Sequence, residues 1–235
     1  MRKRTAVITI VCAVVVAIGA AAIAVGPTVY RTFFASPVTA APSLSADDST
    51  FKTESVAELT PEQLDGTWVV TDGSQAGYRV DELLRGEPFT VVGTTSDVTG
   101  TLRFENLTLE SAQFEVDVAS ITTDSSQRDS YFRGQALNTA THPTARFELS
   151  APVATSQVPV AGEVVEQTLS GDLTIAGVTQ RVTFAVQLRT DGMTTEIVGQ
   201  IPIAFADFGV EAPSLGFVSV EPTGFVEFSL VATHE

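Results

Sequence analysis

The sequence is poor in the side chains on which most enzymes and metal proteins depend. Its 235 residues include one cysteine and two histidines. The cysteine, Cys12, lies within an N-terminal apolar run, so the rest of the chain has no disulfide, thiolate nucleophile or cysteine metal ligand. His142 and His234 fit neither a Ser-His-Asp order nor the H-E-x-x-H spacing of a zinc enzyme. We therefore expect no catalysis, no metal and no cofactor.

Basic residues are scarce as well, because 13 lysines and arginines accompany 28 acidic residues, for a formal net charge of -15. Four of the basic residues, Arg2, Lys3, Arg4 and Arg31, lie beside the N-terminal apolar run, and every acidic residue follows that run. Such a surface repels phosphate backbones, which excludes nucleic acid as a partner. It also argues against electrostatic binding to an anionic membrane face, and it is typical of a soluble exported domain.

The apolar run itself predicts a membrane segment. Residues 5–30 carry no charge and residues 6–25 are almost wholly apolar, which is long enough to cross a bilayer as a helix. The basic residues before the run place the N-terminus in the cytoplasm. We predict that residues 1–31 form a single-pass signal anchor in the cell membrane and that the following domain is extracytoplasmic. Cleavage within residues 35–41, where small residues occur, is the alternative and would give a secreted protein.

Two further regions follow the anchor. Residues 32–65 are rich in Ala, Ser, Thr, Pro and acidic residues without a sustained period, which predicts an extended tether. Residues 66–235 form the domain, and this length is enough for one all-β core.

Apolar and polar residues alternate throughout the domain. Phe114 and Val116 flank Glu115, and residues 169–188 read as two such strands joined by a turn at Gly177. This period of two predicts strands with one apolar and one polar face. Short strands at this spacing favour an all-β antiparallel barrel or sandwich, and we predict a barrel of about eight strands. The predicted strands are residues 67–71, 76–82, 89–95, 98–105, 107–121, 145–149, 163–175, 180–189, 194–205 and 217–232.

One segment, residues 123–141, lacks the alternation and contains two arginines, two aspartates and two aromatic residues. We predict a short helix from about Ser125, with Asp124 or Ser125 as its N-cap, that covers one end of the barrel as a lid. Its charged residues Arg128, Asp129 and Arg133 allow two interpretations. They belong to a salt-bridged lid, or an arginine faces the barrel mouth and binds the polar head of a ligand.

Three sequence elements, in this order, resemble the signature of the YceI-like family of exported, lipocalin-like lipid-binding proteins. They are SITTDSSQRDSYFRGQALNTATHPTARFEL at residues 120–149, SGDLTIAGVTQRV at residues 170–182 and ADFGV at residues 206–210. The matching positions of the first element are Ser120, Ile121, Arg128, Asp129, Phe132, Pro143 and Phe147. Those of the second are Gly171, Leu173, Thr174, Ile175, Gly177, Val178 and Thr179. The chain departs from the family at Phe205, where the family usually has an arginine.

The resemblance implies a lipocalin-like barrel that binds an elongated polyisoprenoid-type lipid, such as an isoprenoid quinone or a polyprenyl carrier, without turnover. The alternation alone allows a second hypothesis, a barrel filled by its own side chains that serves as an adhesion or scaffold module. The residues expected to contact the ligand are Tyr78, Val80, Phe104, Phe114, Val116, Arg128, Phe132, Phe147, Leu173, Phe184, Val186 and Phe205.

Overall fold

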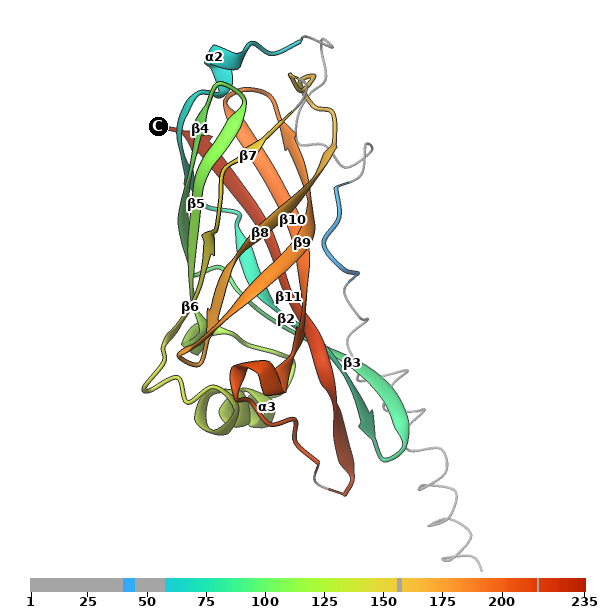
Figure 1. Ribbon diagram of the computed structural model, residues 1–235. Coiled ribbons are helices and arrows are strands. Elements are labelled where there is room, and N and C mark those ends of the chain that lie inside the picture. The colour runs from blue at the N-terminus through green and yellow to red at the C-terminus, as the bar shows by residue number, and fades with distance from the viewer. Residues whose placement is uncertain (1–39, 45–57, 156–157, 215) are drawn as a thin grey trace, which may run out of the picture.

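The alternating segments form strands that hydrogen-bond to one another, as the computed structural model shows for residues 40–44, 58–155, 158–214 and 216–235 (Figure 1). The strands are β1 (Gly66–Val70), β2 (Gln75–Leu84), β3 (Glu87–Thr95), β4 (Val98–Glu105), β5 (Thr108–Asp117), β6 (Thr144–Leu149), β7 (Val153–Ala154), β8 (Val165–Ile175), β9 (Val178–Thr190), β10 (Thr194–Ala204) and β11 (Val218–His234). The short helices are α2 (Pro61–Leu64), η2 (Val118–Ser120), α3 (Ser126–Tyr131), η3 (Phe132–Ala136) and η4 (Phe205–Phe208).

The strands close into a barrel. They follow the order β1-β4-β5-β6-β8-β9-β10-β11, and β11 pairs back with β1, so that eight antiparallel strands form a ring. Strands β2 and β3 continue from β11 as a hairpin that projects beyond the barrel (Figure 1). The prediction of an all-β antiparallel barrel of about eight strands is therefore confirmed. The predicted membrane anchor at residues 1–31 lies outside the described residues, among which no helix is both long and apolar enough to span a bilayer.

Strand β11 holds the ring together because it pairs with three other strands. It pairs with β10 from Thr223 to Thr233, with β2 from Val218 to Ser229, and with β1 at its end, where His234 lies opposite Trp68. Each of these pairings is antiparallel. The closing pair joins strands that are far apart in the sequence, so the barrel depends on long-range contacts.

The hairpin of β8 and β9 turns where the sequence predicts it. Ile175 pairs with Val178, and the two residues between them, Ala176 and Gly177, have φ of 50° and 78°. Such a turn requires the left-handed region, which glycine adopts without steric cost. A Cβ atom on Gly177 would lie 2.6 Å from the ring of His142, so that histidine packs against the turn.

Helices cover the two ends of the barrel (Figure 1). At one end lies α2, whose Leu64 is buried in the core and whose carbonyl accepts a hydrogen bond of 2.9 Å from Trp68 Nε1. Residues 59–64, which we placed in the tether, thus pack against the domain. At the other end lie α3, η3 and η4. Ser125 is the N-cap of α3 and accepts from the Arg128 backbone N–H at 3.4 Å, which confirms the predicted helix start.

Candidate functional site

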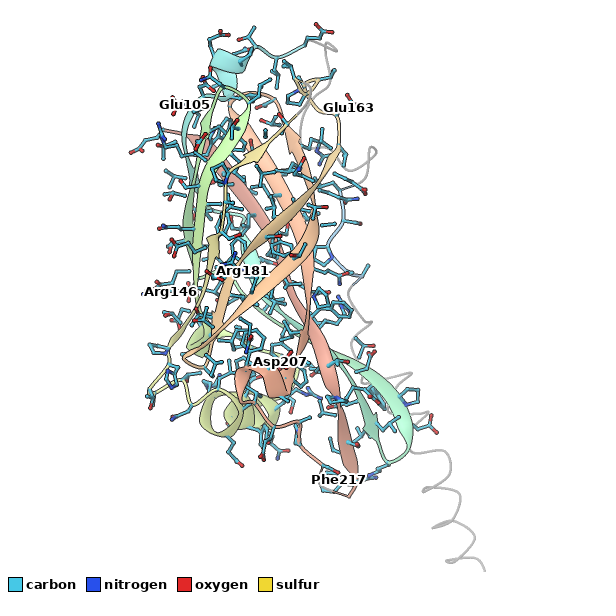
Figure 2. The ribbon with its side chains drawn as sticks, in the orientation of Figure 1. Glu105, Arg146, Glu163, Arg181, Asp207 and Phe217 are labelled. Atoms are coloured by element: carbon cyan, nitrogen blue, oxygen red, sulfur yellow. The ribbon has the colours of Figure 1, made fainter. Side chains whose placement is uncertain are left out.

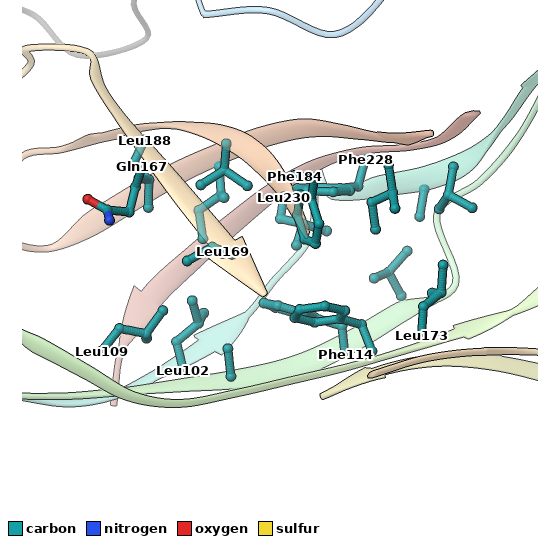
Figure 3. Close-up of a pocket in the computed structure, with 18 of the residues that line it drawn as sticks. Leu102, Leu109, Phe114, Gln167, Leu169, Leu173, Phe184, Leu188, Phe228 and Leu230 are labelled. Atoms are coloured by element: carbon teal, nitrogen blue, oxygen red, sulfur yellow. The ribbon is translucent and has the colours of Figure 1, made fainter. Parts of the chain in front are cut away.

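The barrel encloses an apolar cavity of about 100 Å³ (Figure 3). Its walls come from β2 and from seven of the eight strands of the ring, β4 to β6 and β8 to β11, together with β7. The inward positions of each strand contribute Leu, Val, Ile, Ala and Phe side chains, because successive residues of a strand point to opposite faces. The aromatic members of the lining are Phe104, Phe114, Phe147, Phe184 and Phe228.

Four of these rings form a chain of contacts along the inside of the wall. The centroids of Phe147 and Phe184 are 5.3 Å apart, with the rings inclined by 75°. Phe114 continues the chain on one side, at 6.4 Å from Phe147, and Phe228 continues it on the other, at 6.0 Å from Phe184. Edge-to-face and offset contacts at these distances are favourable for aromatic pairs. The rings therefore stabilise one another as well as form the wall.

Glycines on neighbouring strands make room for three of the rings. A Cβ atom on Gly199 would lie 2.5 Å from the ring of Phe228, and one on Gly171 would lie 2.3 Å from the ring of Phe147. The same holds for Gly100, where the distance to the ring of Phe114 would be 2.4 Å. Because no side chain occupies these positions, each ring lies close against the barrel wall. The glycines thus keep large rings from filling the interior.

Seven of the twelve residues predicted to contact a ligand lie together in the cavity wall. They are Phe104, Phe114, Val116, Phe147, Leu173, Phe184 and Val186. The other five do not border the cavity: Arg128, Phe132 and Phe205 belong to α3, η3 and η4, and Tyr78 and Val80 belong to β2. Val80 is buried in β2, and Phe205 packs beside Gly224, where an added Cβ atom would lie 3.0 Å from the ring.

Two aromatic residues among these five pack on each other. Phe132 of η3 stacks on Tyr78 of β2, with ring centroids 4.8 Å apart and an interplanar angle of 14°. Burial raises the pKa of the Tyr78 phenol well above its ordinary value. The stack joins the predicted lid directly to the barrel wall.

The charged residues of the lid are paired within the protein. Arg128 binds Asp124 at 2.6 Å and the buried Glu82 of β2 at 3.1 Å. Asp129 accepts hydrogen bonds from the backbone N–H and the hydroxyl of Thr123, at 2.9 and 2.7 Å. Burial would lower the pKa of the Arg128 guanidinium, but the two neighbouring carboxylates outweigh it and raise the pKa. These contacts support the interpretation of a salt-bridged lid.

Most of the other wall residues were not among the predicted ligand contacts, and two of these matter most for the site. Phe228 lies in β11, where it follows Val226 and precedes Leu230 at a period of two, and this alternation is the signal that could have found it. Gln167 lies in β8 two residues before Leu169, and both side chains border the cavity (Figure 3). Counting back from Leu169 by twos would have found Gln167. A polar glutamine does not fit the apolar pattern that predicts inward positions.

The lining of the cavity has few polar side chains. Its polar lining side chains belong to Arg146, Thr155 and Gln167. Within the described ranges, no three His, Cys, Asp or Glu side chains converge as metal ligands. An apolar space with few polar groups is suited to enclosing an apolar chain.

Solved structures that share this fold include a polyisoprenoid-binding domain and BcnA. A polyisoprenoid-binding domain from Saccharophagus degradans, implicated in plant cell wall breakdown, aligns with 72% of this chain and 99% of its own, at 17% identity and a TM-score of 0.59. BcnA of Burkholderia cenocepacia aligns with 66% of this chain and 96% of its own, at 24% identity and a TM-score of 0.51. No curated protein matches the sequence. The family model of the YceI-like domain matches residues 68–232, so the chain belongs to the YceI-like family.

Proposed function

We propose that the barrel binds an elongated apolar lipid of the polyisoprenoid type in its interior. The observation that carries this proposal is the enclosed apolar wall with its chain of four aromatic rings. The domain from Saccharophagus degradans, which has the same fold, is a polyisoprenoid-binding domain, and this likeness supports the ligand class. Burial of apolar chain contributes about 0.8 kcal/mol per methylene, so a long hydrocarbon needs no polar contact to bind.

The cavity is small for a lipid, so lipid binding requires that its lining side chains move. Its volume of about 100 Å³ is below that of an engineered cavity of about 150 Å³ that holds benzene, and below the roughly 300–1,000 Å³ of typical ligand pockets. A lipid chain therefore enters only if lining side chains change rotamer as it does so. Rotamer changes of this kind are common on binding. The burial of the chain offsets the cost of the rearrangement.

The same volume favours a second candidate function. A barrel of eight strands is just wide enough for its own side chains to fill it. A filled barrel would act through its outer surface, as a non-catalytic adhesion or scaffold module. This candidate predicts that no lipid is retained by the protein.

The experiment that separates the two is mass spectrometry of organic extracts from the full chain, purified in mild detergent. We expect an isoprenoid lipid in a fixed ratio to protein. Phe184→Asp should abolish it, because the buried ring of Phe184 would be replaced by an unpaired carboxylate in an apolar space. Phe225→Asp is the matched control, since Phe225 is 39% exposed and lies outside the cavity wall. Absence of lipid from the wild type, or its retention by a folded Phe184→Asp variant, would refute the proposal.

The proposal includes a membrane-tethered, extracytoplasmic location for the barrel. It is supported by the uncharged run at residues 5–30 and by the basic residues that precede it. A tether would keep the barrel next to the bilayer in which apolar lipids reside. N-terminal sequencing of the native protein tests it, because a mature terminus within residues 35–43 would mean that the anchor is removed.

A further inference from the structure

One side of the barrel wall is incomplete. Strand β8 pairs with β6 from Gly171 to Thr174, and the last bond across this edge runs from Ser150 N to Ser170 O at 3.0 Å. Strand β7, which follows β6 in the sequence, pairs with β5. Among the described residues, the first half of β8 has no strand partner on the side of β7. In the described part of the wall, no backbone hydrogen bonds therefore join β7 to β8.

The apolar cavity reaches this β7–β8 gap, which we define by Val153 and Thr155 on one side and Gln167 and Leu169 on the other. All four residues border the cavity. Figure 3 places Gln167 at the end of the wall remote from Leu173, with its amide directed away from the aromatic rings. Because β8 runs from the gap towards α3, the gap lies away from the end that the lid covers (Figure 1).

Gln167 differs from the other two polar residues of the wall. The hydroxyl of Thr155 donates to Leu107 O at 3.0 Å. The guanidinium of Arg146 points away from the barrel, as Figure 2 shows, and pairs with Glu115 at 2.7 Å. The amide of Gln167 has no hydrogen-bond partner among the described residues. An amide that borders an apolar cavity and bonds to none of the described residues can donate to, and accept from, the polar head of a bound ligand.

The chemistry of the amide restricts that partner. A glutamine side chain donates two hydrogen bonds and accepts two, which suits a hydroxyl or a carbonyl oxygen. A phosphate would need a cation, and Arg146, the one cationic residue of the described wall, is paired with Glu115. The net charge of -15 also disfavours an anionic head.

We infer that the lipid binds with an uncharged hydroxyl or carbonyl head at the β7–β8 gap, hydrogen-bonded to Gln167, and with its tail directed towards the aromatic rings. This inference rests on the proposed lipid binding. It assigns head-group selection to Gln167 of the wall and not to Arg128 of the lid. It also favours an isoprenoid alcohol or quinone over a polyprenyl phosphate as the ligand.

Three probes with one tail test the assignment on the full chain in detergent: geranylgeraniol, geranylgeranyl phosphate and the hydrocarbon of the same chain without the hydroxyl. We expect the alcohol to bind about 2- to 10-fold more tightly than the hydrocarbon, which is the range of one hydrogen bond, and more tightly than the phosphate. Gln167→Leu should bind alcohol and hydrocarbon equally. Gln113→Leu is the matched control, because Gln113 is exposed on β5, and it should keep the preference.

The outcomes separate this inference from the function on which it rests. If the wild type binds the alcohol and the hydrocarbon equally, prefers the phosphate, or keeps its preference after Gln167→Leu, the head-group inference is wrong and lipid binding stands. If the wild type binds none of the probes, the proposed function fails and the inference fails with it.

A second measurement needs no variant. Geranylgeraniol carrying a diazirine beside its hydroxyl should cross-link on illumination to the peptides of residues 153–155 and 165–169 of the wild type. Cross-links to the lid, residues 123–137, would overturn the inference by placing the head at the opposite end.

Discussion

The ring of Phe132 lies parallel to the ring of Tyr78, at 4.8 Å between centroids and 14° between planes. This contact joins the lid, formed by α3 and η3, to strand β2, which pairs with β11 of the barrel. Both side chains are partly buried and pack against the hydrophobic core. Motion of the lid away from the barrel must break this stack.

We predict that Phe132→Ala speeds lipid loss more than it lowers stability. Truncation of a fully buried phenylalanine costs about 3–5 kcal/mol, and the loss for the partly exposed Phe132 should be smaller. The melting temperature and the rate of lipid release are measured on the same variant. A large stability loss with an unchanged release rate would show that Phe132 is only part of the core.

Tyr78 should make the protein sensitive to alkaline pH. Burial raises the pKa of its phenol in the folded state, whereas in the unfolded chain it ionises near its ordinary value of about 10. Below that value the phenol is neutral in both states and has no effect on the pH dependence. Above it, the unfolded state gains by ionising, so the free energy of unfolding falls as pH rises. Urea titrations at about pH 8 and 11 should show this fall.

The variant Tyr78→Phe isolates the contribution of the phenol. It should remove part of the alkaline loss of stability, because no phenol remains at this position to ionise on unfolding. The same loss in the variant and the wild type would mean that another group is responsible.

The pair of Arg128 and Glu82 should matter more than an exposed ion pair. Arg128→Met leaves the buried Glu82 without this cation, and we expect a loss of about 2–3 kcal/mol, below the usual 3–5 because Arg128 is 27% exposed. Arg103→Met is the matched control, because Arg103 and Glu105 are 56% and 52% exposed, and it should cost at most about 1 kcal/mol. Urea unfolding measures both.

Removal of the remaining charge should reverse part of that loss. In Arg128→Met with Glu82→Gln, no unpaired carboxylate is buried, so stability should recover relative to Arg128→Met alone. Equal losses for the Arg128 and Arg103 variants, or no recovery in the double variant, would contradict the importance of this pair.

Gly199→Ala should narrow the cavity. The added Cβ atom would meet the ring of Phe228 at 2.5 Å, and the nearest atoms all belong to that ring, so the ring must move away from the wall. We expect less lipid per protein by mass spectrometry and a stability cost of about 1–3 kcal/mol. Gly134→Ala is the control, because no atom lies within 4 Å of the added Cβ.

A smaller side chain at position 228 should restore the capacity of the cavity for lipid in the Gly199→Ala variant. Gly199→Ala with Phe228→Leu removes the displaced ring, so the lipid content should return towards that of the wild type. Unchanged lipid content in Gly199→Ala would show that the ring does not limit the cavity.

The inward-facing residues of the barrel could be predicted because apolar and polar residues alternate along its strands. Phe114, Phe147 and Phe184 lie on the apolar side of their strands, and all three border the cavity. The lid helix was predictable from local chemistry, since Ser125 caps it. Both features depend on residues close together in the chain.

The remaining features depend on residues that are far apart in the sequence. The direction of Arg128 is set by Glu82, which lies 46 residues away, and no local pattern reveals this pair. The gap at Gln167 arises because β6 ends at Leu149 while β8 continues, and only Pro152, which lacks an N–H, indicates that the pairing stops there. Gln167 interrupts the apolar face of β8, so its inward direction is recognised only when that face is known.

Strand β11 has a consequence for the order of events during synthesis. It is the last strand in chain order, yet β1, β2 and β10 all depend on it for hydrogen bonds. A nascent chain that lacks residues 218–234 therefore has no ring, and its apolar strand faces stay exposed. Domains that depend on such distant pairings fold slowly. A barrel of this topology therefore completes its fold only after its last strand has left the ribosome.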